Sequence, residues 1–254
     1  MNFGQTKYKF KQEARSLDKI GPLHFMILKL ENTDEFDERI NLIRNIESMI
    51  RLPRPLIQLF LIKMDCHFLI TKILLGEAVS RTGRTNQLSF LKEELEIACF
   101  DFIGELVKSN KRCLMMYEIQ IGEVNLKKMM SLAYTQMINS NLFLRSIMIS
   151  IIFFYDQTID LNFIYSSVLC KSVIDNTSKI VTGLLDEIMG QALSPNNKSS
   201  VITCLMTIYM TKHLGLPCYE SILDLIRTTK KYREELTRIV KIGFLYFSQK
   251  PSDS

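Results

Sequence analysis

The chain has 254 residues, an apolar share of 47%, a charged share of 23% and a net charge of +5 from 32 basic and 27 acidic residues. This length supports a hydrophobic core without bound metals, and the six cysteines are too few for a disulfide scaffold. The basic residues are spread along the chain, so the charge alone excludes no class of partner. No apolar stretch behind a basic start marks a signal peptide, and we expect a reducing, cytoplasmic location.

Two apolar segments are candidates for a membrane span, and neither fits one. The segment from Leu142 to Tyr155 has only 14 residues and contains Arg145, whereas a spanning helix needs about 20 residues. The segment from Leu56 to Val79 is long enough, but it contains polar side chains that are costly in hydrocarbon: Lys63, Asp65, His67 and Lys72. We therefore expect no membrane span.

The N-terminal half of the chain reads as helices separated by proline, glycine and polar breaks. Thr33 is the expected N-cap of a first helix, which ends before Pro53. Apolar residues recur along it at three- and four-residue steps: Phe36, Ile40, Ile43, Ile46 and Ile50. Apolar residues continue from Leu56 to Val79, and the stretch from Ser80 to Asn86 has turn composition. Another helix is expected from about Leu88 to Ser109.

The rest of the chain predicts further helices with short connections. They are expected over Leu114 to Ile119, Val124 to Met137, Leu142 to Phe154, Leu161 to Cys170, Val173 to Ala192, Val201 to His213, Cys218 to Thr228 and Tyr232 to Phe247. Breaks are expected at Asn139 to Asn141, at Ser194 to Ser200 and at Gly215 to Pro217. Asn141 is the expected cap of the helix that holds Arg145.

These helices predict an all-α fold. Roughly ten short-linked helices suit an α-solenoid of the armadillo or HEAT type, in which each helix pair buries its apolar face on the next pair. No fixed sequence period is visible, so the stacking is an inference from helix number and loop length. We expect an N-terminal lead-in over residues 1–32 and a helical repeat domain over residues 33–250.

The sequence predicts no catalytic, cofactor-binding or metal-ligating residue. The histidines His24, His67 and His213 lie in no known local signature. Cys66 and His67 are adjacent, but neighbours on a helix point about 100° apart and cannot form a site alone. The nearest approach to a zinc ligand pair is His213 with Cys218, which is two candidates out of four. No phosphate-binding glycine loop occurs, so we expect a protein that is not an enzyme.

One basic cluster leaves nucleic-acid binding as an alternative function. Lys230, Lys231 and Arg233 surround Tyr232, and cations beside an aromatic ring are typical of single-strand binding. A basic start to an exposed helix explains the cluster about as well. Thirteen methionines could line an adaptable groove, although core filling is the ordinary reading. A nucleic-acid-binding helical repeat therefore stays the alternative to a protein-binding one.

Several residues from Phe100 onward carry a resemblance to a known family. The matching points are Phe100, Asp101, Glu105, Leu106, Lys108 and Asn110, then Asn139, Ser140, Asn141, Leu144 and Arg145, then Leu216, Pro217, Tyr219, Lys230, Lys231 and Tyr232. In order and approximate spacing they resemble the transient-receptor-potential channel 4-associated protein family, also called TRUSS. The resemblance covers Cys99 to about Gln249 and lies toward the C-terminal end of that family's longer chains.

The resemblance implies a helical adaptor that serves as a substrate receptor of cullin-4 ubiquitin ligases, recognises certain protein C-termini for degradation and scaffolds signalling. The partners it implies are the ligase adaptor, substrate C-termini and receptor or channel tails. The matched residues are caps and packing residues, so the resemblance assigns no ligase-contacting or substrate-contacting residue.

Overall fold

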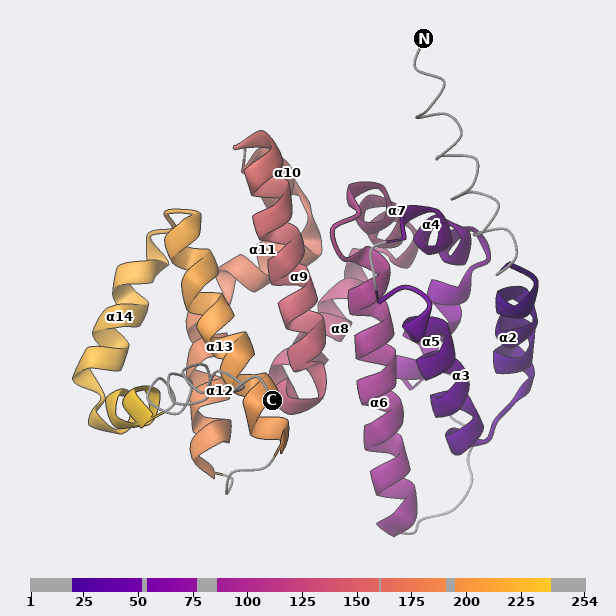
Figure 1. Ribbon diagram of the computed structural model, residues 1–254, viewed down its shortest axis with the longest axis horizontal. Helices are drawn as coiled ribbons and strands as arrows, with labels where there is room; N and C mark the ends of the chain where they lie inside the picture. Colours follow the sequence, from indigo (N-terminus) through magenta and orange to yellow (C-terminus); the bar gives the residue numbers. More distant parts are fainter. Residues whose placement is uncertain (1–19, 52–53, 77–85, 160, 191–194, 239–254) are drawn as a thin grey trace, which may run out of the picture.

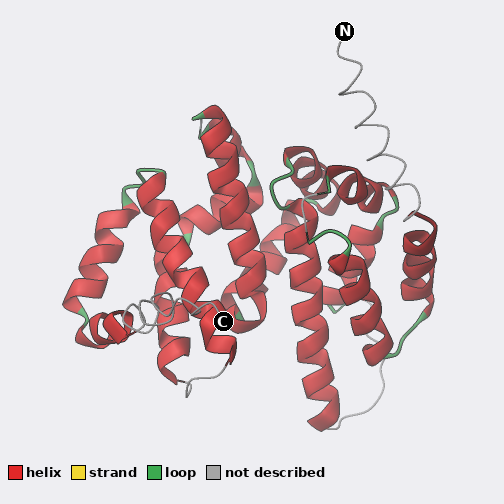
Figure 2. Cartoon of the chain, in the orientation of Figure 1, coloured by secondary structure: helices red, strands yellow, loops and turns green. Residues whose placement is uncertain are grey.

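A computed structural model describes residues 20–51, 54–76, 86–159, 161–190 and 195–238, and all regular structure in these ranges is helical (Figure 2). The all-α prediction is confirmed. The helices are α2 (Ile20–Asn32), α3 (Phe36–Ser48), α4 (Pro55–Lys63), α5 (Cys66–Leu74), α6 (Asn86–Val107), α7 (Lys111–Ile121), α8 (Glu123–Thr135), α9 (Met137–Thr158), α10 (Asn162–Ser166), α11 (Val168–Asp175), α12 (Thr177–Gly190), α13 (Pro195–His213) and α14 (Cys218–Thr228). Residues 230–238 are also helical.

Four helices that are far apart in the sequence pack as successive neighbours: α3 on α6, α6 on α9, and α9 on α13 (Figure 1). Helices α9 and α13 run parallel. Near their starts, the Ser199 hydroxyl donates to Asn141 Oδ1 at 2.7 Å, and near their ends His213 Nε2 lies 2.7 Å from Asp156 Oδ1. Helices α5, α7, α8, α11 and α12 each contact one or more of these four helices.

The periodic apolar stripes form the core. On α3, Ile40, Ile43 and Ile46 are buried as predicted, and Ile50 just beyond the helix is buried with them. The longest interface lies between α6 and α9, where a Cβ on Gly104 would lie 3.1 Å from the Cα atom of Phe143. A side chain at this position would require the facing helix to shift by a few tenths of an ångström.

The residues expected in the lead-in include an ordered helix. Residues 20–32 form α2, which packs on α3 and buries Leu23, Ile27 and Leu30 in the common core. Residues 1–19 lie outside the described part of the chain, as do residues 239–254 and with them most of the helix expected over Tyr232 to Phe247. The helical repeat expected from residue 33 therefore packs directly on α2.

The prediction that Thr33 caps α3 is wrong. The N-cap is Glu35, and its side chain makes no capping hydrogen bond. The Thr33 hydroxyl instead donates to Glu38 Oε2 at 2.5 Å, and its carbonyl accepts from Arg39 Nε at 2.8 Å. The polar groups of Thr33 are thus satisfied by side chains of the helix that follows.

The break predicted at Asn139 to Asn141 is wrong as well, and so is the cap assigned to Asn141. These residues form the first turns of α9, which begins at Met137, and all three are buried. Backbone carbonyls accept hydrogen bonds from two of their side chains. The Ser140 hydroxyl donates to the Ala133 carbonyl of α8 at 2.6 Å, and the Asn141 amide donates to the Ile138 carbonyl at 2.9 Å. Polar residues that favour caps are tolerated in a helix once they find such partners.

Other helix boundaries differ from the predicted ones, and each difference has a structural reason. The segment from Leu56 to Val79 splits into α4 and α5 at Asp65, whose φ of 53° is left-handed. Helix α13 begins at Pro195, inside the predicted break, because proline is favoured at the first helical position. The single helix expected over Leu161 to Cys170 divides at Ser167, which caps α11 by accepting from the Cys170 N–H at 3.1 Å. The bounds predicted for α14 are confirmed.

Glu118 on α7 holds the start of α11. Its Oε1 accepts from the Ser167 hydroxyl at 2.7 Å and from the Leu169 N–H at 2.9 Å. The substitution Glu118→Ala leaves these donors without their acceptor, so we expect a loss of about 1–2 kcal/mol in the free energy of unfolding. Urea denaturation measures this loss of stability, and Glu94→Ala is the control because Glu94 is exposed. Equal stability of the two variants would show that Glu118 does not anchor α11.

Helix α9 is long and apolar enough to cross a membrane by length and composition alone, within the described residues. Of its most apolar 18-residue window, 67% is buried inside the protein. Core helices of soluble proteins pass the same test, so this signal is weak. The absence of a membrane span stays a prediction.

Candidate functional site

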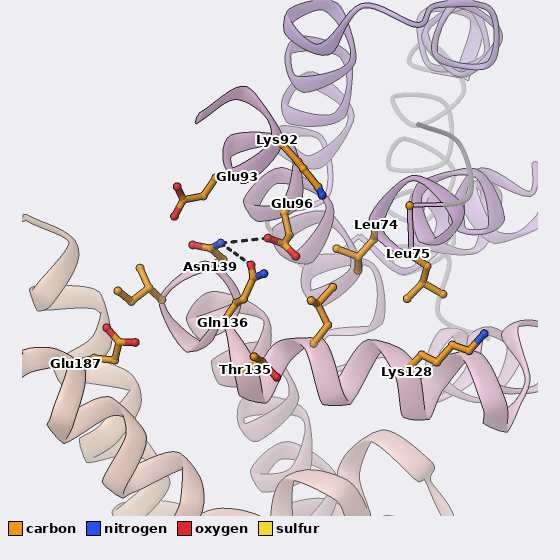
Figure 3. Close-up of a pocket in the computed structure, with 13 residues that line it drawn as sticks. Leu74, Leu75, Lys92, Glu93, Glu96, Lys128, Thr135, Gln136, Asn139 and Glu187 are labelled. Carbon is orange, nitrogen blue, oxygen red and sulfur yellow. Dashed lines mark hydrogen bonds between the residues drawn. The ribbon is translucent and has the colours of Figure 1, made fainter. Parts of the chain in front are cut away.

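An open groove of about 760 Å³ lies where five helices meet. It is lined by Leu74, Leu75, Gly76, Lys92, Glu93, Glu96, Lys128, Leu132, Thr135, Gln136, Ile138, Asn139 and Glu187, which come from the end of α5 and from α6, α8, α9 and α12 (Figure 3). We call it the α6–α9 groove. Its walls thus join segments separated by more than a hundred residues.

The floor of the groove is a polar cluster centred on Glu96. Asn139 Nδ2 donates to Glu96 Oε2 at 3.2 Å and to Gln136 Oε1 at 2.9 Å (Figure 3). In the alternative orientation of the Gln136 amide, turned by 180°, its nitrogen lies 3.1 Å from Glu96 Oε1, and this contact replaces the bond that Gln136 Oε1 accepts from Asn139. Burial raises the pKa of Glu96, and the hydrogen bond from Asn139 opposes that shift. The local reason for the cluster is the short α8–α9 corner, which turns at Gln136 and points Asn139 toward α6.

Charged side chains on the walls are available to a ligand. Among the described residues, Glu93, Glu96 and Glu187 form no ion pair, and neither do Lys92 and Lys128. Three leucines, Leu74, Leu75 and Leu132, add an apolar part to the lining. An open groove with hydrogen-bonding amides, unpaired charges and an apolar wall has the chemistry to hold an extended peptide.

The residues weighed for catalysis or metal binding are spread over the fold. His24 is exposed on α2, whereas His67 is fully buried on α5 and neither of its ring nitrogens has a hydrogen-bond partner. Burial lowers the pKa of His67 to about 4, so its imidazole is neutral at pH 7. Burial raises the pKa of the adjacent Cys66 thiol, which keeps it protonated. A protonated thiol beside a neutral imidazole is not an activated nucleophile.

His213 and Cys218 do not form a ligand pair. His213 bonds Asp156 and stacks on Tyr209 with ring centroids 5.4 Å apart, while Cys218 Sγ accepts from the Thr177 hydroxyl at 3.3 Å. No group of three or more histidine, cysteine and acidic side chains with metal-binding geometry occurs among the residues that the structure describes.

The basic cluster is balanced by acidic partners. Lys230 lies 3.7 Å from Glu234, and Lys231 lies 3.8 Å from Asp186. Tyr232 donates to the same Asp186 at 3.2 Å. Because these pairs are exposed, each contributes little to stability, but together they lower the positive potential that nucleic acid would need.

The residues that carried the family resemblance are mostly structural. Asp101 is buried against Arg44, and burial raises the pKa of the Asp101 carboxyl to about 6. Asn110 caps α7 by accepting from the Cys113 N–H at 3.1 Å. Asn139 is the exception because it lies in the groove, where the sequence reading had placed only a spacer. Nothing local in the sequence marks the groove, since its walls meet only in the folded chain.

The described part of the chain is thus all-helical, with an open groove of mixed polarity between its helices. The family described as "Protein of unknown function (DUF3689)" matches residues 5–214, and the chain belongs to this family. No curated protein and no solved structure matches the chain.

Proposed function

We propose that the protein is a non-catalytic adaptor that holds segments of other proteins in the α6–α9 groove. The observation that carries the proposal is the groove itself, with hydrogen-bonding amides on its floor and unpaired charges and leucines on its walls. Such a lining offers backbone and side-chain contacts to an extended segment, as peptide-recognition sites do.

The stacking of the helices supports an α-solenoid of armadillo or HEAT character. In such folds, equivalent helices of successive repeats lie parallel and contact only their neighbours. In the series α3, α6, α9 and α13 each helix packs on the next, and α9 and α13 run parallel. A solenoid brings segments from several repeats to one surface, which suits a receptor for extended partners.

The most specific form of the proposal is a cytoplasmic substrate receptor of a cullin-4 ubiquitin ligase that recognises protein C-termini for degradation and scaffolds signalling. Its support is the resemblance of Asp101, Asn139 and Arg145, with their neighbours, to the transient-receptor-potential channel 4-associated protein family. The proposed partners are the ligase adaptor, substrate C-termini and receptor or channel tails.

Affinity capture of the full chain from cell lysate, followed by mass spectrometry, tests the ligase form of the proposal. We expect cullin-4 and its adaptor among the recovered proteins, together with substrates that accumulate when the proteasome is inhibited. Recovery of stable partners without cullin-4 or its adaptor would overturn the ligase role and leave a scaffold. Recovery of no stable partner would overturn the adaptor role itself.

The alternative is a nucleic-acid-binding helical repeat, and its support is weaker. The basic cluster that motivated it is paired with acidic groups, including Asp186 and Glu234. In a filter-binding titration with single-stranded RNA and DNA at low salt, we expect no retention above a control protein. Retention that falls steeply with added salt would favour the alternative.

A further inference from the structure

The two sides of the α6–α9 groove differ in charge. Glu93 and Glu187 lie on one side, while Lys128 lies on the other with Leu74 and Leu75, and Lys92 lies between the two sides near Glu96 (Figure 3). The two acidic residues come from α6 and α12, and the lysine comes from α8. The packing of distant helices therefore produces a charge difference across the groove that no single segment contains.

Between these sides lies the half-buried Glu96. Its carboxylate accepts from Asn139, but it has no cationic partner within ion-pair distance among the described residues. A carboxylate can accept about four hydrogen bonds, so Glu96 retains capacity for N–H donors. A partly desolvated carboxylate interacts with an added cation more strongly than an exposed one does. Lys92, one helical turn from Glu96 on α6, offsets part of this negative charge. The carboxylates of Glu93, Glu96 and Glu187 outnumber it, so the centre and the acidic side together favour a ligand that brings positive charge.

The opposite side favours a different group. Leu74, Leu75 and Leu132 offer apolar contact, and the unpaired Lys128 ammonium attracts an anion. A ligand that lies across the groove therefore contacts the carboxylates with one end and the leucines and Lys128 with the other. An extended peptide can satisfy such a series because its side chains are spaced regularly along the chain.

We infer that the groove selects extended peptide segments of bipolar charge, with a basic side chain against Glu93, Glu96 and Glu187 and an apolar residue followed by a carboxylate on the Leu74 and Lys128 side. This inference rests on the proposed function, and it adds the chemistry and the orientation of the bound segment. We assign the carboxylate to an acidic side chain, because the groove is open and lets an extended segment continue past Lys128.

Selection from a library of displayed random peptides, followed by affinity measurement on the enriched sequences, tests the inference. We expect enriched peptides to carry Lys or Arg at one end and an apolar residue with a carboxylate at the other, in one order along the chain. Each enriched peptide is then synthesised with a free and with an amidated C-terminus. We expect equal affinity of the two forms, because the carboxylate is a side chain. Loss of affinity on amidation would overturn this assignment and place the end of the partner chain at Lys128.

Charge-reversal variants locate the binding. We expect the double variant Glu93→Lys and Glu187→Lys to weaken these peptides about tenfold, and Lys128→Glu to weaken them to a similar degree. The matched controls are Glu94→Lys and Lys171→Glu, because both residues are exposed and lie outside the groove lining. The controls should bind as the unmodified chain does. Circular dichroism verifies that each variant is folded.

The outcomes separate this inference from the proposed function. Enrichment without charge bias, or an equal effect of the groove and control variants, would overturn the bipolar groove. So would enrichment of no peptide at all. In each case, recovery of cullin-4 and its adaptor from lysate would leave the adaptor role standing, with its contacts on another surface.

Discussion

Replacing Phe143 by alanine is expected to lower the free energy of unfolding by about 3–5 kcal/mol, the range for truncation of a buried phenylalanine. Phe143 is fully buried on α9, and its ring centroid lies 5.5 Å from that of Phe100 on α6. Gly104 lies against the Phe143 backbone, so α6 and α9 are already closely packed where the cavity would form. Because α6 and α9 also supply Glu96 and Asn139, the groove should lose its shape with the core.

Urea denaturation at pH 7 measures this loss, and Phe25→Ala is the control. Phe25 on α2 is 66% exposed, so its truncation should change stability by less than about 0.5 kcal/mol. Similar stabilities of the Phe143 and Phe25 variants would contradict the view that the α6–α9 contact is the centre of the fold.

The second large effect is a loss of stability in acid that depends on His67. Its imidazole is fully buried without hydrogen bonds, and burial lowers its pKa to about 4 from an ordinary value of 6.5. The unfolded chain therefore takes up the proton at a higher pH than the folded chain does. Stability is complete above pH 6.5 and falls as the pH decreases toward 4, by about 3 kcal/mol over this window.

The substitution His67→Leu should remove this part of the pH dependence, and His24→Leu on the exposed surface should retain it. The comparison must be made as a difference between variants, because the raised pKa of Asp101 acts in the opposite direction: its carboxyl takes up a proton more readily in the folded chain. The measurement is the free energy of unfolding at pH 7, 5.5 and 4.5. Parallel curves for the unmodified chain and His67→Leu would contradict the account of a buried neutral histidine.

The sequence predicted where helices occur more accurately than it predicted the residues at which they begin and end. Periodic positions such as Ile43 and Ile46 identified the buried face of α3, because a three- and four-residue repeat has one structural meaning. The run from Asn139 to Asn141 was misread because Asn and Ser favour caps only when no distant partner satisfies them. Here the partners include Glu96, 43 residues earlier in the chain. Such long-range hydrogen bonds cannot be inferred from local composition.

The groove was harder to predict from the sequence than the helix ends were. Its residues belong to helices whose individual patterns are ordinary, and the pattern of one of them places Lys92 and Glu96 on the solvent side. Only the packing of α12 beside the α8–α9 corner brings Glu187 to the same surface. The expectation that no catalytic residue exists rested on missing motifs, and it stays a prediction.

The most direct test of the central claim, that the α6–α9 groove holds other proteins, is affinity capture with the groove filled by one side chain. Thr135 is exposed, lies in the groove and ends α8, so Thr135→Trp should block it without disturbing the core. Ser131→Trp places the same bulk on the exposed surface one turn earlier, outside the groove lining. We expect quantitative mass spectrometry to recover the partners of the unmodified chain with Ser131→Trp and to lose them with Thr135→Trp. Recovery of the same partners by all three proteins would contradict the claim.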